Sequence, residues 1–349
     1  MNITACLDMA GCPNRCRHCW LGATPNGSLT PDDLQFVAAE FRPFAENLEI
    51  FSWYREPDYR DDYKALWELE RQLSDVKTPH FENVSIWRTV RDADYAPWLR
   101  DLGVKYAQLT VFGGETTTDW YFGRRGAFAE LNRTVDILLE HGIAPRIQTF
   151  VSKRNIGELP IIERWIDDAA LEQRCADIGR EFQYFLHQGS CDGENAQFYG
   201  DWVTPAELEK IPPKLAAFAL KHWRADSLAD IFGRTETELY RELADDESTA
   251  SFVSNDVTFY IDKDFNVYPN IETPSPAWYL GNLKTDGAES VINAYNHSVS
   301  IAQNARLTVP LGDMIRLCGD RTSQRLFLKS DYIMYILNKY CEVRFAGSI

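Results

Sequence analysis

Apolar runs alternate with stretches of helical periodicity along the first part of the chain. Six runs rich in β-branched and aromatic residues predict strands at 2–7, 48–53, 81–87, 106–112, 143–151 and 182–187. Between them, apolar residues recur three and four positions apart, which predicts helices at 30–45, 61–73, 95–102, 126–141 and 156–170. A segment rich in Gly and Thr, 113–123, predicts a loop after the fourth strand.

This alternation predicts an α/β fold. Strands separated by helices form parallel βαβ units with right-handed crossovers. We therefore expect a partial (β/α)6 TIM-like barrel over residues 1–200. In such barrels the functional groups gather at the carboxyl ends of the strands, so the loops that follow the strands are the first place to look for chemistry.

The pattern changes beyond residue 200. Helices are predicted at 204–221, 228–245, 288–302, 311–318 and 324–341. Two short strands, 257–261 and 266–269, read as a β-hairpin. We expect a second unit over 201–349, made of this C-terminal β-hairpin plus helices.

The charge balance narrows the choice of partners. The chain has 349 residues, with 36 basic and 52 acidic side chains and a net charge of −16. Nucleic acids and anionic membrane surfaces both attract clustered Lys and Arg, so we expect neither as a partner. No apolar stretch reaches the roughly 18 residues that span a bilayer, and no signal peptide begins the chain, which predicts a cytoplasmic protein. In that reducing compartment the eight cysteines are expected to be metal ligands, catalytic thiols or buried apolar groups.

Three cysteines lie close together in the loop after the first strand. Cys12, Cys16 and Cys19 have the spacing Cys-x3-Cys-x2-Cys. Thiolates are soft ligands that select zinc or iron–sulfur clusters, and such centres normally take four ligands. Three cysteines therefore leave one coordination position open.

This spacing after a short apolar strand resembles the signature of the radical SAM superfamily. The resemblance implies that Cys12, Cys16 and Cys19 hold three irons of one 4Fe-4S cluster, whose fourth iron binds S-adenosyl-L-methionine. It also implies an enzyme whose 5′-deoxyadenosyl radical abstracts hydrogen from an unactivated carbon, with a flavodoxin or ferredoxin as reductant. A non-catalytic zinc or iron–sulfur scaffold or sensor stays open as the alternative.

The same resemblance implies cofactor-binding residues. His18, directly before the third cysteine, is expected beside the adenine. Glu56 and Pro57 match the end of the family's Gly-Gly-Glu-Pro motif, which receives the methionine ammonium, although Tyr54 and Arg55 replace its glycines.

Further polar residues lie at the ends of later strands. Thr110 is expected to contact the ribose or carboxylate, and Gln148 and Lys153 are placed similarly around the fifth strand. The segment Gly113-Gly114-Glu115 competes with Glu56, but it follows the fourth strand and lacks the proline.

The predicted hairpin resembles the start of a SPASM or twitch domain, a type of domain that binds auxiliary iron–sulfur clusters. The glycine of that pattern falls at Phe265 or Asn266, and its cysteine position holds Asn270. The later cysteine cluster is missing as well. The resemblance therefore implies a degenerate, twitch-like scaffold without auxiliary-cluster cysteines.

Cys191 follows the sixth predicted strand and is a candidate catalytic residue. A thiol near the radical can donate a hydrogen atom to a carbon radical, as in some radical SAM epimerases, although a plain loop cysteine remains the other interpretation.

The substrate is expected to be a small natural product, a sugar or a peptide. A start almost at the first strand suggests no N-terminal peptide-recognition domain and favours a small molecule, whereas a SPASM-like tail favours a peptide.

Overall fold

The structure is a computed structural model that describes residues 1–7, 12–19, 29–51, 59–76, 84–189, 193–269 and 275–345. Its strands are β1 (Asn2–Leu7), β2 (Asn47–Phe51), β3 (Tyr106–Thr110), β4 (Ala144–Phe150), β5 (Gln183–His187), β6 (Arg234–Thr235), β7 (Asp256–Ile261), β8 (Asn266–Tyr268), β9 (Gly281–Asn282) and β10 (Leu326–Phe327).

The helices of the first half are α1 (Pro31–Phe41), α2 (Tyr63–Leu73), α3 (Ile86–Arg91), α4 (Tyr95–Asp101), α5 (Glu115–Phe122), α6 (Ala127–Glu140), α7 (Leu159–Asp168) and α8 (Leu171–Asp177). Those of the second half are α9 (Pro205–Leu208), α10 (Pro213–Trp223), α11 (Leu228–Phe232), α12 (Glu236–Leu243), α13 (Gly287–Asn296), α14 (Ile301–Thr308), α15 (Leu311–Cys318) and α16 (Lys329–Phe345).

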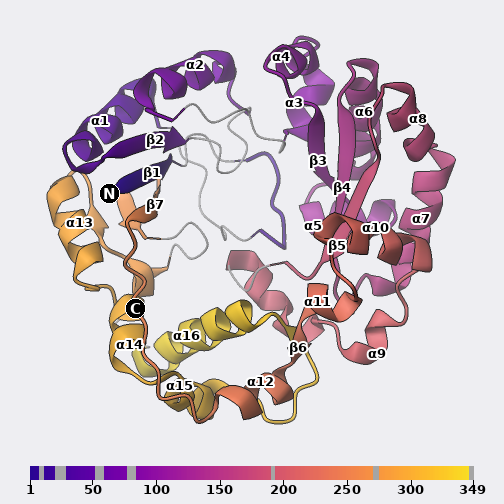
Figure 1. The fold of residues 1–349 in the computed structure, drawn as a ribbon. Helices are drawn as coiled ribbons and strands as arrows, with labels where there is room; N and C mark the ends of the chain where they lie inside the picture. Colours follow the sequence, from indigo (N-terminus) through magenta and orange to yellow (C-terminus); the bar gives the residue numbers. More distant parts are fainter. Residues whose placement is uncertain are drawn as a thin grey trace.

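Two sheets make up the barrel-like part of the molecule. One has the strand order β2-β1-β7-β8-β9 and the other the order β3-β4-β5. The contacts of β1 with β2 and β7, and those within β3-β4-β5, are parallel. Figure 1 shows the two sheets facing each other across the middle of the molecule, with α1, α2 and α13 outside one and α6, α7 and α8 outside the other. This open arrangement confirms the predicted class, an α/β fold of the partial TIM-barrel type.

Alternation along the strands divides each sheet into an outer and an inner face. The outer residues of the β3-β4-β5 sheet, such as Leu109, Ile147 and Leu186, are buried in one apolar cluster with α6 and α7. Ile3, Ala5 and the outer residues of β2 and β7 form a second cluster with α1 and α13. The outer faces therefore hold the fold together, which leaves the inner faces to carry polar groups.

The C-terminal hairpin is joined to the N-terminal strand. β7 pairs with β1 in parallel register from Asn2↔Asp256 to Leu7↔Ile261, and β8 pairs with β7 in antiparallel register. At its turn Phe265 has φ 68°, the left-handed conformation that favours glycine. Phe265 is nonetheless buried, and its ring packs against Phe36 at 5.8 Å. The hairpin prediction is confirmed, while the boundary between 1–200 and 201–349 stays a prediction.

Two sequence predictions about local structure are wrong. Residues 86 and 87, expected at the end of a strand, begin α3, because the Ser85 hydroxyl caps the helix by accepting from the backbone N–H of Arg88 at 3.1 Å. The start of that expected strand, 81–83, lies outside the described residues. The segment 113–123, expected as a loop, contains the helix α5 with Gly114 before it and Gly123 after it.

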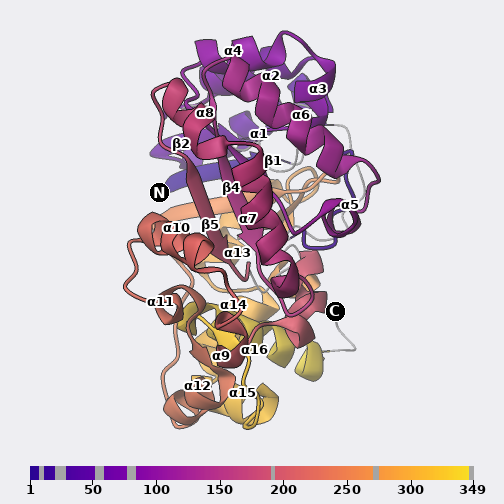
Figure 2. The same cartoon turned by 90° about the vertical axis from the view of Figure 1, so that its right-hand side faces the viewer.

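Helices were also predicted too long in the second half. The stretch 228–245 divides into α11, the short strand β6 and α12, and the stretch 324–341 divides into β10 and α16. The cause is the antiparallel pairing of β6 with β10, which interrupts both helical patterns. In Figure 2 these C-terminal elements, with α14 and α15, gather at the lower end of the molecule as it is drawn.

Candidate active site at the carboxyl ends of the strands

The cysteine loop, residues 12–19, leaves the carboxyl end of β1 and reaches the opposite sheet. Its Arg15 and Arg17 backbone N–H groups donate to the carbonyls of Phe122 and Tyr121 at 3.1 and 2.8 Å. These two residues form the last turn of α5, and both views show the indigo trace of the loop beside that helix (Figures 1 and 2). The loop thus connects the end of one sheet to a helix on the other.

α5 begins at Glu115 because side chains satisfy the backbone groups at its N-terminal end. The Thr118 hydroxyl accepts from the backbone N–H of Phe112 at 3.2 Å and donates to the carbonyl of Gly113 at 3.1 Å. The Glu158 carboxylate, which follows β4 in the chain, accepts the backbone N–H of Gly114 at 2.9 Å. An acidic group at a helix N-terminus is also favoured by the helix dipole.

The three predicted ligands are in no disulfide and have different surroundings. Cys16 packs against the apolar cluster of the β3-β4-β5 sheet, whereas Cys19 packs against Cys6 and Tyr260 of the other sheet. The Cys12 sulfur accepts the backbone N–H of Asn14 at 3.4 Å. All three residues are partly exposed.

Cys6 is set apart from these three. It is buried on β1, and burial, with the nearby carboxylates of Glu49 and Glu70, raises the pKa of its thiol well above the usual value. A protonated thiol is a poor metal ligand. Among the described cysteines around the loop, burial and charge thus set Cys6 apart from Cys12, Cys16 and Cys19.

Within the described ranges, no group of three or more His, Cys, Asp and Glu side chains is arranged to hold one metal ion. Thiolates around a single zinc share bonds of about 2.3 Å to one ion, whereas cluster ligands each bind a different iron and stand farther apart. The donor set, three cysteine thiols on one docked loop, fits a cluster in its chemistry. The assignment of Cys12, Cys16 and Cys19 as ligands stays a prediction.

His18 turns into the protein rather than into solvent. Its ring lies among the rings of Phe112, Phe150 and Tyr121, with centroid distances of 4.5, 5.2 and 6.2 Å. Burial lowers the pKa of His18 to about 3, so the imidazole is neutral. The ring is therefore a flat, uncharged surface at the carboxyl ends of β3 and β4. Its expected contact with adenine stays a prediction.

The inner face of the second sheet is polar. Thr110 and Gln148 are register partners on β3 and β4, and the Thr110 hydroxyl donates to the Gln148 amide oxygen at 3.4 Å. Gln148 also accepts from the Gln108 amide at 2.7 Å, and the Gln108 oxygen accepts from the Arg146 guanidinium at 2.8 Å. The structure thus brings two predicted cofactor-binding residues, Thr110 and Gln148, side by side.

Sequence reasoning missed His187, where this chain of hydrogen bonds ends. Its Nε2 lies 2.6 Å from the Gln148 amide nitrogen, and its Nδ1 faces the backbone N–H of Gly189 at 3.2 Å. Both neighbours offer hydrogens, so a protonated imidazole would meet a donor at each nitrogen. Burial lowers the pKa of His187 to about 4, and the nearby His222 adds to this. The ring is therefore held neutral.

Lys153 and Arg154 follow β4 in the chain but lie on the surface. The Lys153 side chain is exposed, and its backbone N–H donates to the carbonyl of Asp201 at 2.6 Å. Arg154 forms an ion pair with the Asp201 carboxylate at 2.8 Å. The structure does not bring Lys153 to the inner face with Thr110 and Gln148, so its predicted cofactor contact is left without support from its position.

Three predicted site residues, Glu56, Pro57 and Cys191, lie outside the described residues. The segment after Cys191 is described as η4 (Gly193–Asp201), which packs over the cysteine loop. The Gln197 amide donates to the carbonyl of Arg17 at 2.8 Å, and the Phe198 ring packs against Tyr121 at 5.7 Å. η4 therefore covers the docked loop from the side of β5.

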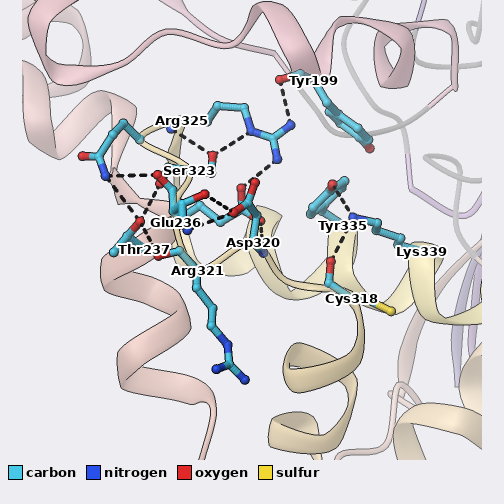
Figure 3. A network of polar contacts seen from close by, with 12 residues as sticks. Tyr199, Glu236, Thr237, Cys318, Asp320, Arg321, Ser323, Arg325, Tyr335 and Lys339 are labelled. Atoms are coloured by element: carbon cyan, nitrogen blue, oxygen red, sulfur yellow. Dashed lines mark hydrogen bonds and ion pairs between the residues drawn. The ribbon is translucent and has the colours of Figure 1, made fainter.

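Arg325, directly before β10, holds η4 in this place. Arg325 donates to the carbonyl of Tyr199 at 3.0 Å and forms an ion pair with the fully buried Glu236 at 2.7 Å (Figure 3). The second Glu236 oxygen accepts the backbone N–H of Asp320 at 3.1 Å. A buried carboxylate needs this full set of partners, because an unpaired charge in the interior is costly. The C-terminal layer thus supports the mouth of the site.

A partial α/β barrel with a three-cysteine loop after its first strand defines the class of protein. Residues 7–154 match the family model "Radical SAM superfamily", from the end of β1 to the loop after β4. This segment belongs to the radical SAM superfamily. The predicted enzyme class and its cofactors, a 4Fe-4S cluster and S-adenosylmethionine, are confirmed at the level of this superfamily.

Solved structures share the fold over the whole chain. Native anSMEcpe with bound AdoMet (S-adenosylmethionine) is 14% identical, with a TM-score of 0.55 over 99% of this chain and 98% of that chain. Native anSMEcpe with bound AdoMet and Cp18Cys peptide is also 14% identical, with a TM-score of 0.54 and 99% of each chain covered. At this level of identity the likeness shows the fold alone.

One curated relative matches in sequence. Fe-coproporphyrin III synthase of Methanosarcina barkeri (strain Fusaro / DSM 804) is 23% identical over 167 residues. The match takes in 47% of this chain and only 40% of that protein. In the part of the chain that the structure describes, no helix has the length and apolar character needed to cross a membrane.

The neutral state of His187 predicts a pH dependence of stability. Its pKa is about 4 when folded against 6.5 when unfolded, so between these values the unfolded chain binds more protons. Lowering the pH from 7 to 5 should cost about 2 kcal/mol of unfolding free energy through this residue. Urea unfolding of the apo protein at both pH values measures the change.

The matched variant is His187→Phe, which keeps an aromatic ring and cannot titrate. It should lose this part of the pH dependence, whatever its stability at pH 7. Equal pH slopes for wild type and variant would show that the imidazole is not held neutral.

Proposed function

We propose that this chain uses a 4Fe-4S cluster and S-adenosylmethionine to abstract a hydrogen atom from an unactivated carbon of a peptide substrate. The observation that carries the proposal is the three-thiol loop at the carboxyl end of β1, within a segment that matches the radical SAM superfamily. When bound, the cofactors supply a 5′-deoxyadenosyl radical, which makes a strong bond to the abstracted hydrogen.

The protein's own residues would bind the two cofactors and orient them. Cys12, Cys16 and Cys19 would hold the cluster, and the neutral ring of His18 would lie against the adenine. Thr110 and Gln148 would offer polar contacts on the inner face, where their hydrogen bond at 3.4 Å fixes them together. Glu56 would accept the methionine ammonium, with Pro57 shaping its loop. The cofactor carries the difficult chemistry, and the protein supplies position and exclusion of water.

Two observations bear on the substrate class. The fold is shared over the whole chain with anSMEcpe in a structure that contains the Cp18Cys peptide, which supports a peptide. The sequence match to a protein named Fe-coproporphyrin III synthase keeps a small molecule as the second candidate. The proposed modification is an epimerisation or another change at a C–H bond, and analysis of the product identifies which.

The reductant is proposed to be a flavodoxin or ferredoxin. Around the cysteine loop, Arg15, Arg17, Arg125 and Lys153 are exposed, on a chain whose net charge is −16. A local basic surface of this kind attracts an acidic carrier protein and makes its association dependent on ionic strength.

The central test is anaerobic reconstitution with iron and sulfide. Wild-type protein should become brown and release 5′-deoxyadenosine from S-adenosylmethionine when dithionite is added, and a reduced flavodoxin or ferredoxin should replace dithionite at low salt. Cys16→Ala should lose the brown colour and the product, because the loop then lacks one of its three thiolates. Iron analysis and chromatography of the nucleoside measure both.

Cys175→Ala is the matched control for Cys16→Ala. Cys175 is also a free thiol, but it is fully buried in the apolar core beside α7 and should not affect cluster loading. A colourless wild-type protein that retains zinc would instead favour a non-catalytic scaffold or sensor.

The substrate class can be separated by protease treatment. A cell extract from which proteins have been removed should stimulate release of 5′-deoxyadenosine when it contains the substrate. If the substrate is a peptide, prior digestion of the extract with a non-specific protease should abolish the stimulation. Stimulation that survives digestion would exclude the peptide proposal and favour the small molecule.

Cys191 is proposed as the hydrogen-atom donor of an epimerisation. Its S–H bond would break as a C–H bond forms on the substrate radical, and the sulfur radical left behind would take one electron and one proton from the reductant system. Cys191→Ala should keep substrate-dependent 5′-deoxyadenosine release and lose the epimerised product, as seen by chiral analysis. Unchanged product would rule out this role.

A further inference from the structure

The two spacers between the predicted cysteine ligands are both held by the end of α5. The first spacer, 13–15, donates through the backbone N–H of Arg15 to the Phe122 carbonyl at 3.1 Å. The second spacer, 17–18, donates through the backbone N–H of Arg17 to the Tyr121 carbonyl at 2.8 Å. The last carbonyls of a helix have no partner within the helix, so α5 offers unused acceptors at the place where the loop passes.

Gly123 permits this close approach. It ends α5 in the left-handed conformation, with φ 62°. A Cβ atom at this position would lie 2.2 Å from the Arg15 carbonyl oxygen and 2.9 Å from its carbonyl carbon. These atoms are backbone and cannot rotate away, so any side chain at position 123 pushes the cysteine loop off the helix.

Arg124, the residue after Gly123, holds the cysteine loop through a second contact. The Arg124 guanidinium donates to the Asn14 amide oxygen at 2.8 Å and pairs with Glu130 of α6 at 2.6 Å. Asn14 is buried, and its backbone N–H points to the Cys12 sulfur at 3.4 Å. Contacts from α5 and from Arg124, between α5 and α6, therefore reach the residues between and beside the predicted ligands.

We propose that Gly123 is a positioning residue that sets the geometry of the three cysteines before any cluster is bound. The proposal rests on the proposed function, because it takes Cys12, Cys16 and Cys19 as the ligands. The loop keeps its shape through protein contacts alone, and the cluster enters a preformed set of thiols. Groups that orient metal ligands in this way typically contribute about 10- to 100-fold to metal affinity.

The test compares two glycines with similar backbone conformations. Gly126 has φ 80°, and a Cβ atom there would meet nothing within 4 Å. Gly123→Ala and Gly126→Ala therefore introduce the same strain, but only the first displaces the loop. We expect Gly123→Ala to lower iron binding at limiting iron by about 10- to 100-fold, and Gly126→Ala to bind iron like wild type.

Asparagine variants separate strain from displacement. Asn tolerates the left-handed conformation but still carries a Cβ atom. Gly123→Asn should therefore fail in iron binding as Gly123→Ala does, while Gly126→Asn should behave as wild type. If Gly123→Asn restores normal iron binding, strain alone explains the alanine variant and the proposal is wrong.

Two further readouts distinguish positioning from general loss of structure. Thermal unfolding of the apo proteins should be a cooperative transition in both variants, with Gly123→Ala the less stable of the two because it also loses the contacts of the docked loop. Whatever cluster Gly123→Ala retains should give an altered electron paramagnetic resonance signal after reduction, with a smaller change on addition of S-adenosylmethionine. A cluster with the wild-type signal and wild-type iron affinity would overturn the proposal.

Asn14→Ala gives an independent test if the glycine variants fold poorly. It removes the acceptor of the Arg124 hydrogen bond and leaves the backbone of α5 intact. Iron binding should fall, and a wild-type iron affinity would count against loop docking. Failure of the wild-type protein itself to take up iron would overturn the proposed function. Normal wild-type loading together with unaffected variants would overturn this inference alone.

Discussion

The fold depends on the position of β1 between two parallel neighbours. β1 pairs with β2 along one edge and with β7 along the other, so both of its edges are occupied. Its outer side chains, Ile3, Ala5 and Leu7, are buried in the apolar cluster with α1 and α13. A strand held on both edges and on one face has little freedom, and its carboxyl end delivers the cysteine loop at a fixed place.

The candidate site is assembled from both sheets of the barrel-like part of the molecule. Cys19 packs against the sheet that contains β1, whereas Cys16 packs against the cluster behind β3, β4 and β5. The polar row from Arg146 to His187 lies on the inner face of that second sheet, and η4 covers the loop from its edge. Through Arg325 and Glu236, the C-terminal helices take part in shaping the site without contributing a predicted ligand to it.

Much of the first half could be predicted from the sequence, because its strands and helices carry strong apolar periodicity. The predicted ligands were found for the same reason, since a motif of spaced cysteines is a local signal. The helix α5 was missed because its stability comes from Thr118 and from Glu158, which is 44 residues from the Gly114 amide it accepts. Nothing in the local pattern of 113–123 reports such a distant partner.

The pairing of β7 with β1 and the row that ends at His187 could not be predicted for a related reason. Polar residues at alternate positions of a strand are visible in the sequence, but which of them meet depends on the register between strands. Gln148 contacts Gln108 and His187 because β3, β4 and β5 align at those positions. The sequence shows the candidates, and only the assembled sheet shows the contacts.

The distance between β1 and β7 along the chain has a consequence for biosynthesis. Asn2 contacts Asp256, 254 residues later, so the ribosome completes β1 long before it makes the neighbour on that edge. At about 5–20 residues per second, this interval lasts tens of seconds. During that time the emerging strand has one open edge, and Cys19 lacks its neighbour Tyr260 on β7. Cofactor insertion is therefore expected to follow translation, and nascent chains depend on protection of that edge until synthesis passes β7.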